Sequence, residues 1–249
     1  MKTFLFLCLL PLALLAMTNE EVARRSDAAV SGFGSSVARV RMTLRNAEGG
    51  ESIREFEMRT LDKEDGDRSL IRFLLPSDIK ETRLLTHEVI GGDDRQWIYL
   101  PALKRIKRIS GSNKSGAFVG SEFSYEDLAS FDYRKYRYGG NAEEVDEEGL
   151  PCYLGERVPT DAGSAYTKQV IWVDRASFLV RRVDYYDRQN TLAKTARFGG
   201  YRKIDGLWRV GTIEMQNHHN RKTTLLEWKE DRVRAGLTEG AFEKRTLKE

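Results

Sequence analysis

The sequence contains few of the residues on which catalytic and metal sites usually depend. Its 249 residues include two cysteines and three histidines, whereas a metal site needs several such ligands close together. His218 and His219 are adjacent, so in a strand they point to opposite faces, and His87 is distant from both. There is no phosphate-binding loop, no Gly-x-Ser-x-Gly turn and no His-Glu-x-x-His motif. We therefore expect no metal, no cofactor and no enzyme, with a hydrolase site assembled from scattered Asp, Glu and Ser residues as the least favoured alternative.

Net charge and long apolar runs are also scarce. The chain has 41 Lys and Arg against 38 Asp and Glu, an excess too small for a nucleic-acid-binding arm. The one long apolar run, Phe4 to Ala16, follows Lys2 and contains Pro11. It is shorter than the roughly 20 residues of a membrane span. This arrangement is typical of a cleavable secretory signal, which we place at residues 1–16, with an uncut membrane anchor as the alternative. The remainder is expected to be soluble in the periplasm.

Residues 17–249 are expected to form one domain, because no Pro-, Gly- or Ser-rich boundary divides them. After cleavage Cys152 would be the only thiol, so no internal disulfide can form. Its place within a predicted strand favours a buried, inert side chain over a nucleophile. Thr18 and Glu21 match a capping box, which predicts a short helix that ends near Ala29.

Beyond this helix, alternating apolar and polar residues predict strands that are joined by short turns. Such turns imply antiparallel neighbours, because a parallel pair needs a long crossover. Residues 125–129 have helical potential, and the acidic run at 143–148 is interpreted as a solvated turn. The predicted strands are 37–44, 53–61, 68–75, 83–90, 96–100, 104–109, 152–158, 167–174, 178–186, 192–201, 207–216 and 223–228.

Several of these strands are apolar on both faces. Trp97 and Tyr99 alternate with Ile98 and Leu100, and the strands around residues 71 and 171 show the same pattern. An antiparallel sheet with one wet face would alternate cleanly, and only one or two short helices are available as a cover. The fold class is therefore α+β and mostly β. It is either a strongly curved antiparallel sheet around an apolar hollow, covered by short helices, or a two-sheet sandwich.

The most specific motif is GSEFSYEDL at residues 120–128. With WIYLP at 97–101, the basic run at 105–108, IWVD at 171–174, FLVRR at 178–182 and YYD at 185–187, it resembles the exported LolA-like family of outer membrane lipoprotein-sorting proteins. Glu122 stands where that family usually has an aspartate. The resemblance covers essentially all of residues 17–249.

This resemblance implies a half-open barrel of antiparallel strands whose mouth is covered by helices. It also implies a periplasmic binding protein that carries lipid or lipoprotein acyl chains in an apolar groove, where each buried CH₂ contributes about 0.8 kcal/mol. An inner-membrane exporter and an outer-membrane acceptor are the expected partners. Candidate groove-lining residues are Trp97, Tyr99, Phe123, Tyr125 and Trp172, for each of which an ordinary core position is the alternative.

A basic cluster is formed by Lys104, Arg105, Lys107 and Arg108, together with Lys114. It is interpreted either as an exposed strand edge that charge keeps soluble or as a contact for anionic lipid head groups or a protein partner. Under the protein-partner hypothesis, the chain is an envelope sensory or adaptor module that transports no lipid. Arg105, Lys107 and Arg108 are the candidate contact residues.

Overall fold

The computed structural model describes residues 16–249, so the predicted signal sequence lies outside the described residues except for Ala16. The first helix, α1 (Asn19–Val30), begins as predicted, since the Thr18 side chain accepts a hydrogen bond from the Glu21 N–H. The Glu21 carboxylate bonds Arg24 and Arg25 along the helix rather than closing the capping box. Within residues 16–249, none of the helices combines the length and the apolar character that a membrane crossing requires.

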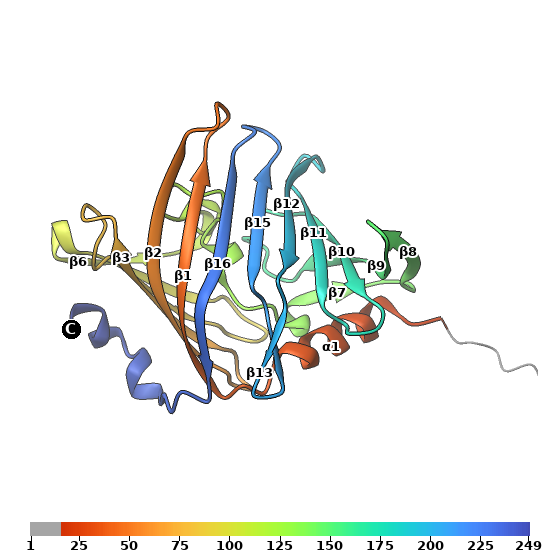
Figure 1. Ribbon diagram of the computed structural model, residues 1–249, viewed down its shortest axis with the longest axis horizontal. Helices are drawn as coiled ribbons and strands as arrows, with labels where there is room; N and C mark the ends of the chain where they lie inside the picture. The colour runs from red at the N-terminus through yellow and green to blue at the C-terminus, as the bar shows by residue number, and fades with distance from the viewer. Residues whose placement is uncertain (1–15) are drawn as a thin grey trace, which may run out of the picture.

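One curved antiparallel sheet of fourteen strands dominates the structure (Figure 1). The first long strand of the sheet pairs with the last, and short hairpins connect most of the others. The sheet order is β6-β5-β4-β3-β2-β1-β16-β15-β12-β11-β10-β9-β7, with β8 paired to β9. Among the described residues no pairing joins β6 to β7, so the barrel is half open. The strands are β1 (Ser35–Arg45), β2 (Glu51–Leu61), β3 (Arg68–Leu75), β4 (Arg83–His87), β5 (Arg95–Leu100), β6 (Arg105–Ile109), β7 (Tyr136–Tyr138), β8 (Glu143–Glu147), β9 (Leu150–Pro159), β10 (Lys168–Asp174), β11 (Val180–Tyr186), β12 (Leu192–Gly199), β15 (Thr212–Asn217) and β16 (Thr223–Val233).

The inner face of the sheet holds the main core. Every second residue of the central strands points inward, and these positions are apolar, as with Val40 and Met42 in β1 and Phe56 in β2. On the outer face of the same strands, charged side chains form partly exposed pairs such as Arg39 with Glu55 and Arg59 with Glu57. In β1 and β2 the alternation therefore sets which face is buried, as expected for a sheet with one face in water.

Two pieces of chain cover the inner face. Helix α1 lies across one end, against β7, β9 and β14 (Leu207–Arg209). Its first residue packs close to β9, where a Cβ on Gly155 would stand 2.5 Å from Asn19 Oδ1. The second piece is the irregular segment 110–135, which contains the short 3-10 turns η2 (Gly111–Ser115), η3 (Phe118–Gly120), η4 (Glu126–Leu128) and η5 (Tyr133–Lys135).

The C-terminal segment covers part of the outer face. After β16 the chain forms η6 (Glu239–Phe242) and η7 (Lys244–Lys248), outside the sheet in Figure 1. Phe242 and Leu247 pack against Leu70 and Leu85 in a second apolar cluster. The two-faced apolar pattern of β3, β4 and β5 therefore has a simple cause, because both of their faces are buried by the same chain.

Three predicted segments differ from the structure. The strands predicted at 192–201 and 207–216 are interrupted by a separate hairpin, β13 (Arg202–Ile204) with β14. The two ends of this hairpin cross closely at Gly200 and Gly211. Only glycine fits there, because a Cβ on Gly211 would lie 2.2 Å from the Gly200 carbonyl oxygen. The acidic run interpreted as a solvated turn is instead mostly strand β8, although most of its residues are exposed.

Candidate functional site

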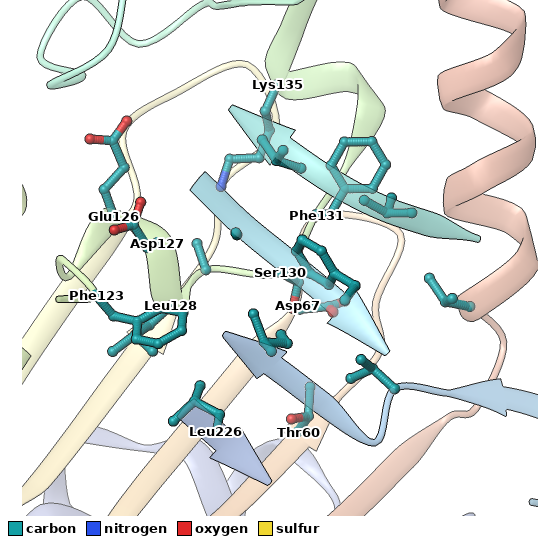
Figure 2. A pocket seen from close by; sticks show the side chains of 18 of the residues that line it. Thr60, Asp67, Phe123, Glu126, Asp127, Leu128, Ser130, Phe131, Lys135 and Leu226 are labelled. Atoms are coloured by element: carbon teal, nitrogen blue, oxygen red, sulfur yellow. The ribbon is translucent and has the colours of Figure 1, made fainter. Parts of the chain in front are cut away.

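A cavity of about 360 Å³ lies between the concave face and its cover. An engineered cavity of about 150 Å³ with an apolar lining stays dry and binds benzene, so this one has room for a larger apolar group. Figure 2 shows Leu226 and Thr60 on the sheet side and Phe123, Leu128 and Phe131 on the covering segment. Its sheet side is largely apolar, formed by Ala38, Phe56, Met58, Ile71, Val183, Ala196, Phe198, Ile213, Met215, Leu226 and Trp228.

A segment that we call the strap, residues 118–128, spans the cavity. It contains the motif at residues 120–128 that the sequence analysis singled out. At one end Gln96 of β5 donates to the Tyr125 carbonyl at 2.9 Å. At the other end the Glu122 N–H donates to Thr224 Oγ1 of β16 at 3.0 Å, and Asn217 of β15 donates to the Glu122 carboxylate at 2.6 Å. The strap is thus bonded to strands on both sides of the cavity. Glu122, the departure from the LolA-like pattern, serves as one of these anchors.

The other two acidic residues of the motif, Glu126 and Asp127, anchor the strap to a neighbouring loop and to β12. Asp127 accepts from the Ser124 N–H at 2.7 Å and the Tyr166 hydroxyl at 2.8 Å, and pairs with Lys194 at 3.0 Å. Glu126 accepts from the Ser164 hydroxyl and the Ala165 N–H, and burial raises the pKa of its carboxyl above the ordinary value. These carboxylates therefore hold the cover in place.

A second polar cluster lies at the edge of the cavity, on the loops after β4 and after the strap. Lys135 Nζ is 2.6 Å from the Asp94 carboxylate and 3.4 Å from the Glu88 carboxylate. Glu88 is only 2% exposed. Burial raises the pKa of Glu88 to about 7 even though Lys135 lowers it. Burial likewise raises the pKa of Asp67 to about 6. The loops that flank the cavity are thus joined through carboxyl groups, and burial raises the pKa of two of them, Glu88 and Asp67.

Replacing Glu88 with glutamine is expected to change how stability depends on pH. A carboxyl whose folded pKa is raised stabilises the fold below its unfolded pKa, near 4.5, and that contribution is lost as pH rises through about 7. The free energy of unfolding of Glu88→Gln relative to the wild type should therefore rise between pH 5 and pH 8, by on the order of 2 kcal/mol. Urea unfolding at both pH values measures it. A Glu57→Gln control on the outer face should show no such trend, and a pH-independent difference for Glu88→Gln would contradict the assignment.

The structure separates the five residues predicted to line the groove. Phe123 lines the cavity. Tyr125 packs on the Phe118 ring, with ring centroids 5.7 Å apart, in the strap. Trp97 and Tyr99 pack in the outer cluster under the C-terminal segment, and Trp172 stacks with Arg182, whose guanidinium carbon lies 4.3 Å from its ring centroid. The last four are not among the lining residues, because strand parity turns three of them to the outer face and the strap directs Tyr125 to the core.

The predicted basic cluster is only partly a cluster. Arg105, Lys107 and Arg108 are exposed on β6, the strand at one end of the sheet order. Lys114 is instead 5% exposed and pairs with Asp161 at 3.0 Å, which ties the 110–135 segment to the loop before β10. Arg105, Lys107 and Arg108 therefore form the positive edge together with the exposed Lys104, and Lys114 is not part of it.

His218 and His219 have local partners, and Cys152 is a buried free thiol. His218 Nε2 is 2.9 Å from Thr195 Oγ1, and His219 Nε2 is 3.2 Å from the Asp187 carboxylate. Cys152 is buried, and burial raises the pKa of its thiol. Within the described part of the chain, no group of three or more His, Cys, Asp or Glu side chains is arranged to hold a metal ion.

Most of the lining residues on the sheet side of the cavity come from inward positions of strands that the sequence pattern already indicated. Val183, Ala196 and Met215 are examples, and all three are buried. The pattern alone could not separate the inner from the outer face where both are apolar. Trp208 and Val210 also line the cavity, but Trp208 lies in β14 of the hairpin that the sequence did not separate from its neighbouring strands, and Val210 directly follows it.

Comparison with known proteins agrees with this geometry. A family model described as "-like: Uncharacterized protein" matches residues 65–249, and no curated protein matches the chain. A solved domain from Vibrio parahaemolyticus, described as an outer membrane lipoprotein-sorting protein domain, is 43% identical over 92% of this chain and 98% of its own, with a TM-score of 0.87. A DUF1329 family protein from Desulfovibrio piger is 32% identical over 92% of this chain and 97% of its own, with a TM-score of 0.84.

A more distant structure shows the fold alone. A LolA superfamily protein from Nitrosomonas europaea is 19% identical over 93% of this chain and 100% of its own, with a TM-score of 0.75. The half-open, covered sheet expected from the sequence is therefore confirmed. The chain has the LolA-like fold and belongs to the same family as the outer membrane lipoprotein-sorting protein domain from Vibrio parahaemolyticus and the DUF1329 protein from Desulfovibrio piger.

Proposed function

We propose that this protein is a periplasmic carrier that binds an acyl chain of a lipid or lipoprotein and makes or breaks no covalent bond. The observation that carries the proposal is the cavity of about 360 Å³ with its largely apolar floor, beneath a strap bonded to both sides of the sheet. Burial of hydrocarbon against that floor supplies affinity at about 0.8 kcal/mol per CH₂. An inner-membrane exporter that loads the cargo and an outer-membrane acceptor that receives it are the partners this role requires.

Filling the cavity is expected to abolish most of the binding. Ala196 is buried on the floor, and a phenylalanine there would occupy the space of several CH₂ groups. If two CH₂ groups of the ligand lose their contact with the floor, the affinity for the ligand falls by about tenfold or more. Displacement of a fluorescent fatty acid measures this loss, and native mass spectrometry of protein purified from the periplasm measures the bound lipid directly.

The matched control is Arg197→Phe, since Arg197 is the next residue of β12 and is exposed on the opposite face. It should bind like the wild type. An unchanged affinity in Ala196→Phe, or wild-type protein with no lipid and no fatty acid uptake, would rule out the carrier. An adaptor would take up no amphiphile, so the same titration separates it from a carrier.

A further inference from the structure

Arg157 is a buried cation at the cavity without an acidic partner. It lies in β9, directly opposite Gln169 of β10, and is 5% exposed. Its Nε–H donates to Gln169 Oε1 at 2.8 Å, while its Nη1 has no hydrogen-bond partner among the described residues. The guanidinium carbon lies 4.1 Å from the centroid of the Tyr136 ring and 4.3 Å from that of Phe131. These aromatic faces hold the charged group in position.

The other cations that line the cavity are neutralised. Lys135 pairs with Asp94 and Glu88, and Arg209 lies 2.9 Å from Asp231. Arg157 forms no ion pair within residues 16–249, although Asp161 also lines the cavity, because Asp161 pairs with Lys114. A buried charge without a counter-charge is unfavourable, so an arginine held in this way is suited to an anion that arrives with a ligand.

The size of the cavity limits what accompanies that anion. In proportion to the roughly 150 Å³ that accommodates the six carbons of benzene, the 360 Å³ found here corresponds to about fourteen carbons. That is one hydrocarbon chain rather than two or three. Arg157, Gln169 and the apolar floor line the same cavity, so one ligand can contact both the charged and the apolar parts.

We propose that Arg157 binds the anionic head group, a carboxylate or a phosphate, of a single-chain amphiphile whose hydrocarbon lies on the apolar floor. This inference rests on the proposed carrier function and names its substrate class. The guanidinium supplies N–H donors in a planar fork that matches the oxygens of either group. The two sources of such an anion are a fatty acid and a phosphate-bearing lipid.

Three ligands with the same fourteen-carbon chain test the proposal: tetradecanoate, tetradecyl phosphate and tetradecanol. Calorimetric titration of the wild-type protein should show the anions binding about ten- to a hundredfold more tightly than the alcohol, as expected for hydrogen bonds to a charged group. Arg157→Met should reduce the affinity for the anions to that for tetradecanol and leave tetradecanol binding unchanged. Arg157→Lys should retain part of the preference. Arg197→Met, on the outer face, is the matched control and should change nothing.

The outcomes separate the inference from the function on which it rests. If all three ligands bind equally to the wild type, or if Arg157→Met keeps the preference for anions, the role of Arg157 is overturned and the carrier function stands. If none of the three binds, the carrier function fails as well. If Arg157→Met does not fold, the preference of the wild type for the anions over the alcohol, and its partial loss in Arg157→Lys, still test the role of Arg157. The tighter of the two anions identifies the source of the head group.

Discussion

Replacing Asp127 with alanine is expected to lower the free energy of unfolding by about 3 to 5 kcal/mol, the cost of removing one partner from a buried ion pair. The Asp127 side chain is 1% exposed, and its partner Lys194 is 15% exposed. The variant would leave the Lys194 ammonium and the Tyr166 hydroxyl without their acceptor in a poorly hydrated site. It would also remove the bond to the Ser124 N–H, which closes the turn at the end of the strap.

Urea unfolding measures this loss, and two further variants identify its cause. Glu57→Ala removes a carboxylate from a partly exposed pair on the outer face and should cost less than about 1 kcal/mol. Adding Lys194→Met to Asp127→Ala removes the unpaired cation and should restore part of the stability. A loss for Asp127→Ala no larger than that for Glu57→Ala would show that the strap is not held by this carboxylate.

The strands could be predicted well wherever local chemistry marks their ends. Strand β3 runs over the predicted residues 68–75, because a Gly66 turn precedes it and Pro76 follows it. The first hairpin was also predicted, since its alternation is regular and its turn contains Gly49 and Gly50. The crossing at Gly200 and Gly211 could not be predicted, because the glycines approach each other only in the folded chain.

The cavity could be predicted only in outline. Apolar residues on both faces of a strand indicated that both faces are covered, but parity does not say which face is concave. Trp97 and Ile98 illustrate the difficulty, because neighbouring residues of β5 belong to the outer and inner clusters respectively. The sequence could not identify Arg157 as a binding residue. It has no acidic partner because Asp94 pairs with Lys135 and Asp161 pairs with Lys114, and these pairs form only in the folded chain.

The strands have more apolar surface than the short helices can cover, and from the sequence this favoured a hollow. In the structure this apolar surface has two sources. One is the cavity floor, and the other is the outer cluster under the C-terminal segment. Only the first bears on the ligand binding that we propose. The second is a stability feature that consists of residues far apart in the chain, such as Leu85 and Leu247, without a periodic pattern that would reveal it.

Phe242→Ala separates these two sources, with an expected loss of about 3 to 5 kcal/mol in the free energy of unfolding. Phe242 is 1% exposed against Leu70, Leu85 and Leu247. Its carbonyl oxygen lies 2.7 Å from His87 Nε2, so the contact also positions the segment. The cavity lies on the opposite face of the sheet, and fatty acid affinity at low urea should therefore stay within about twofold, because the core there is unchanged.

Leu103→Ala, which changes an apolar residue that is 54% exposed, is the control and should change stability by less than about 0.5 kcal/mol. If Phe242→Ala cost as little as the control, the C-terminal segment would be detached in solution and the outer face of β3 to β5 would stand exposed. If it abolished fatty acid binding while the protein remained folded, the two faces of the sheet would be coupled, and the outer cluster would belong to the binding function after all.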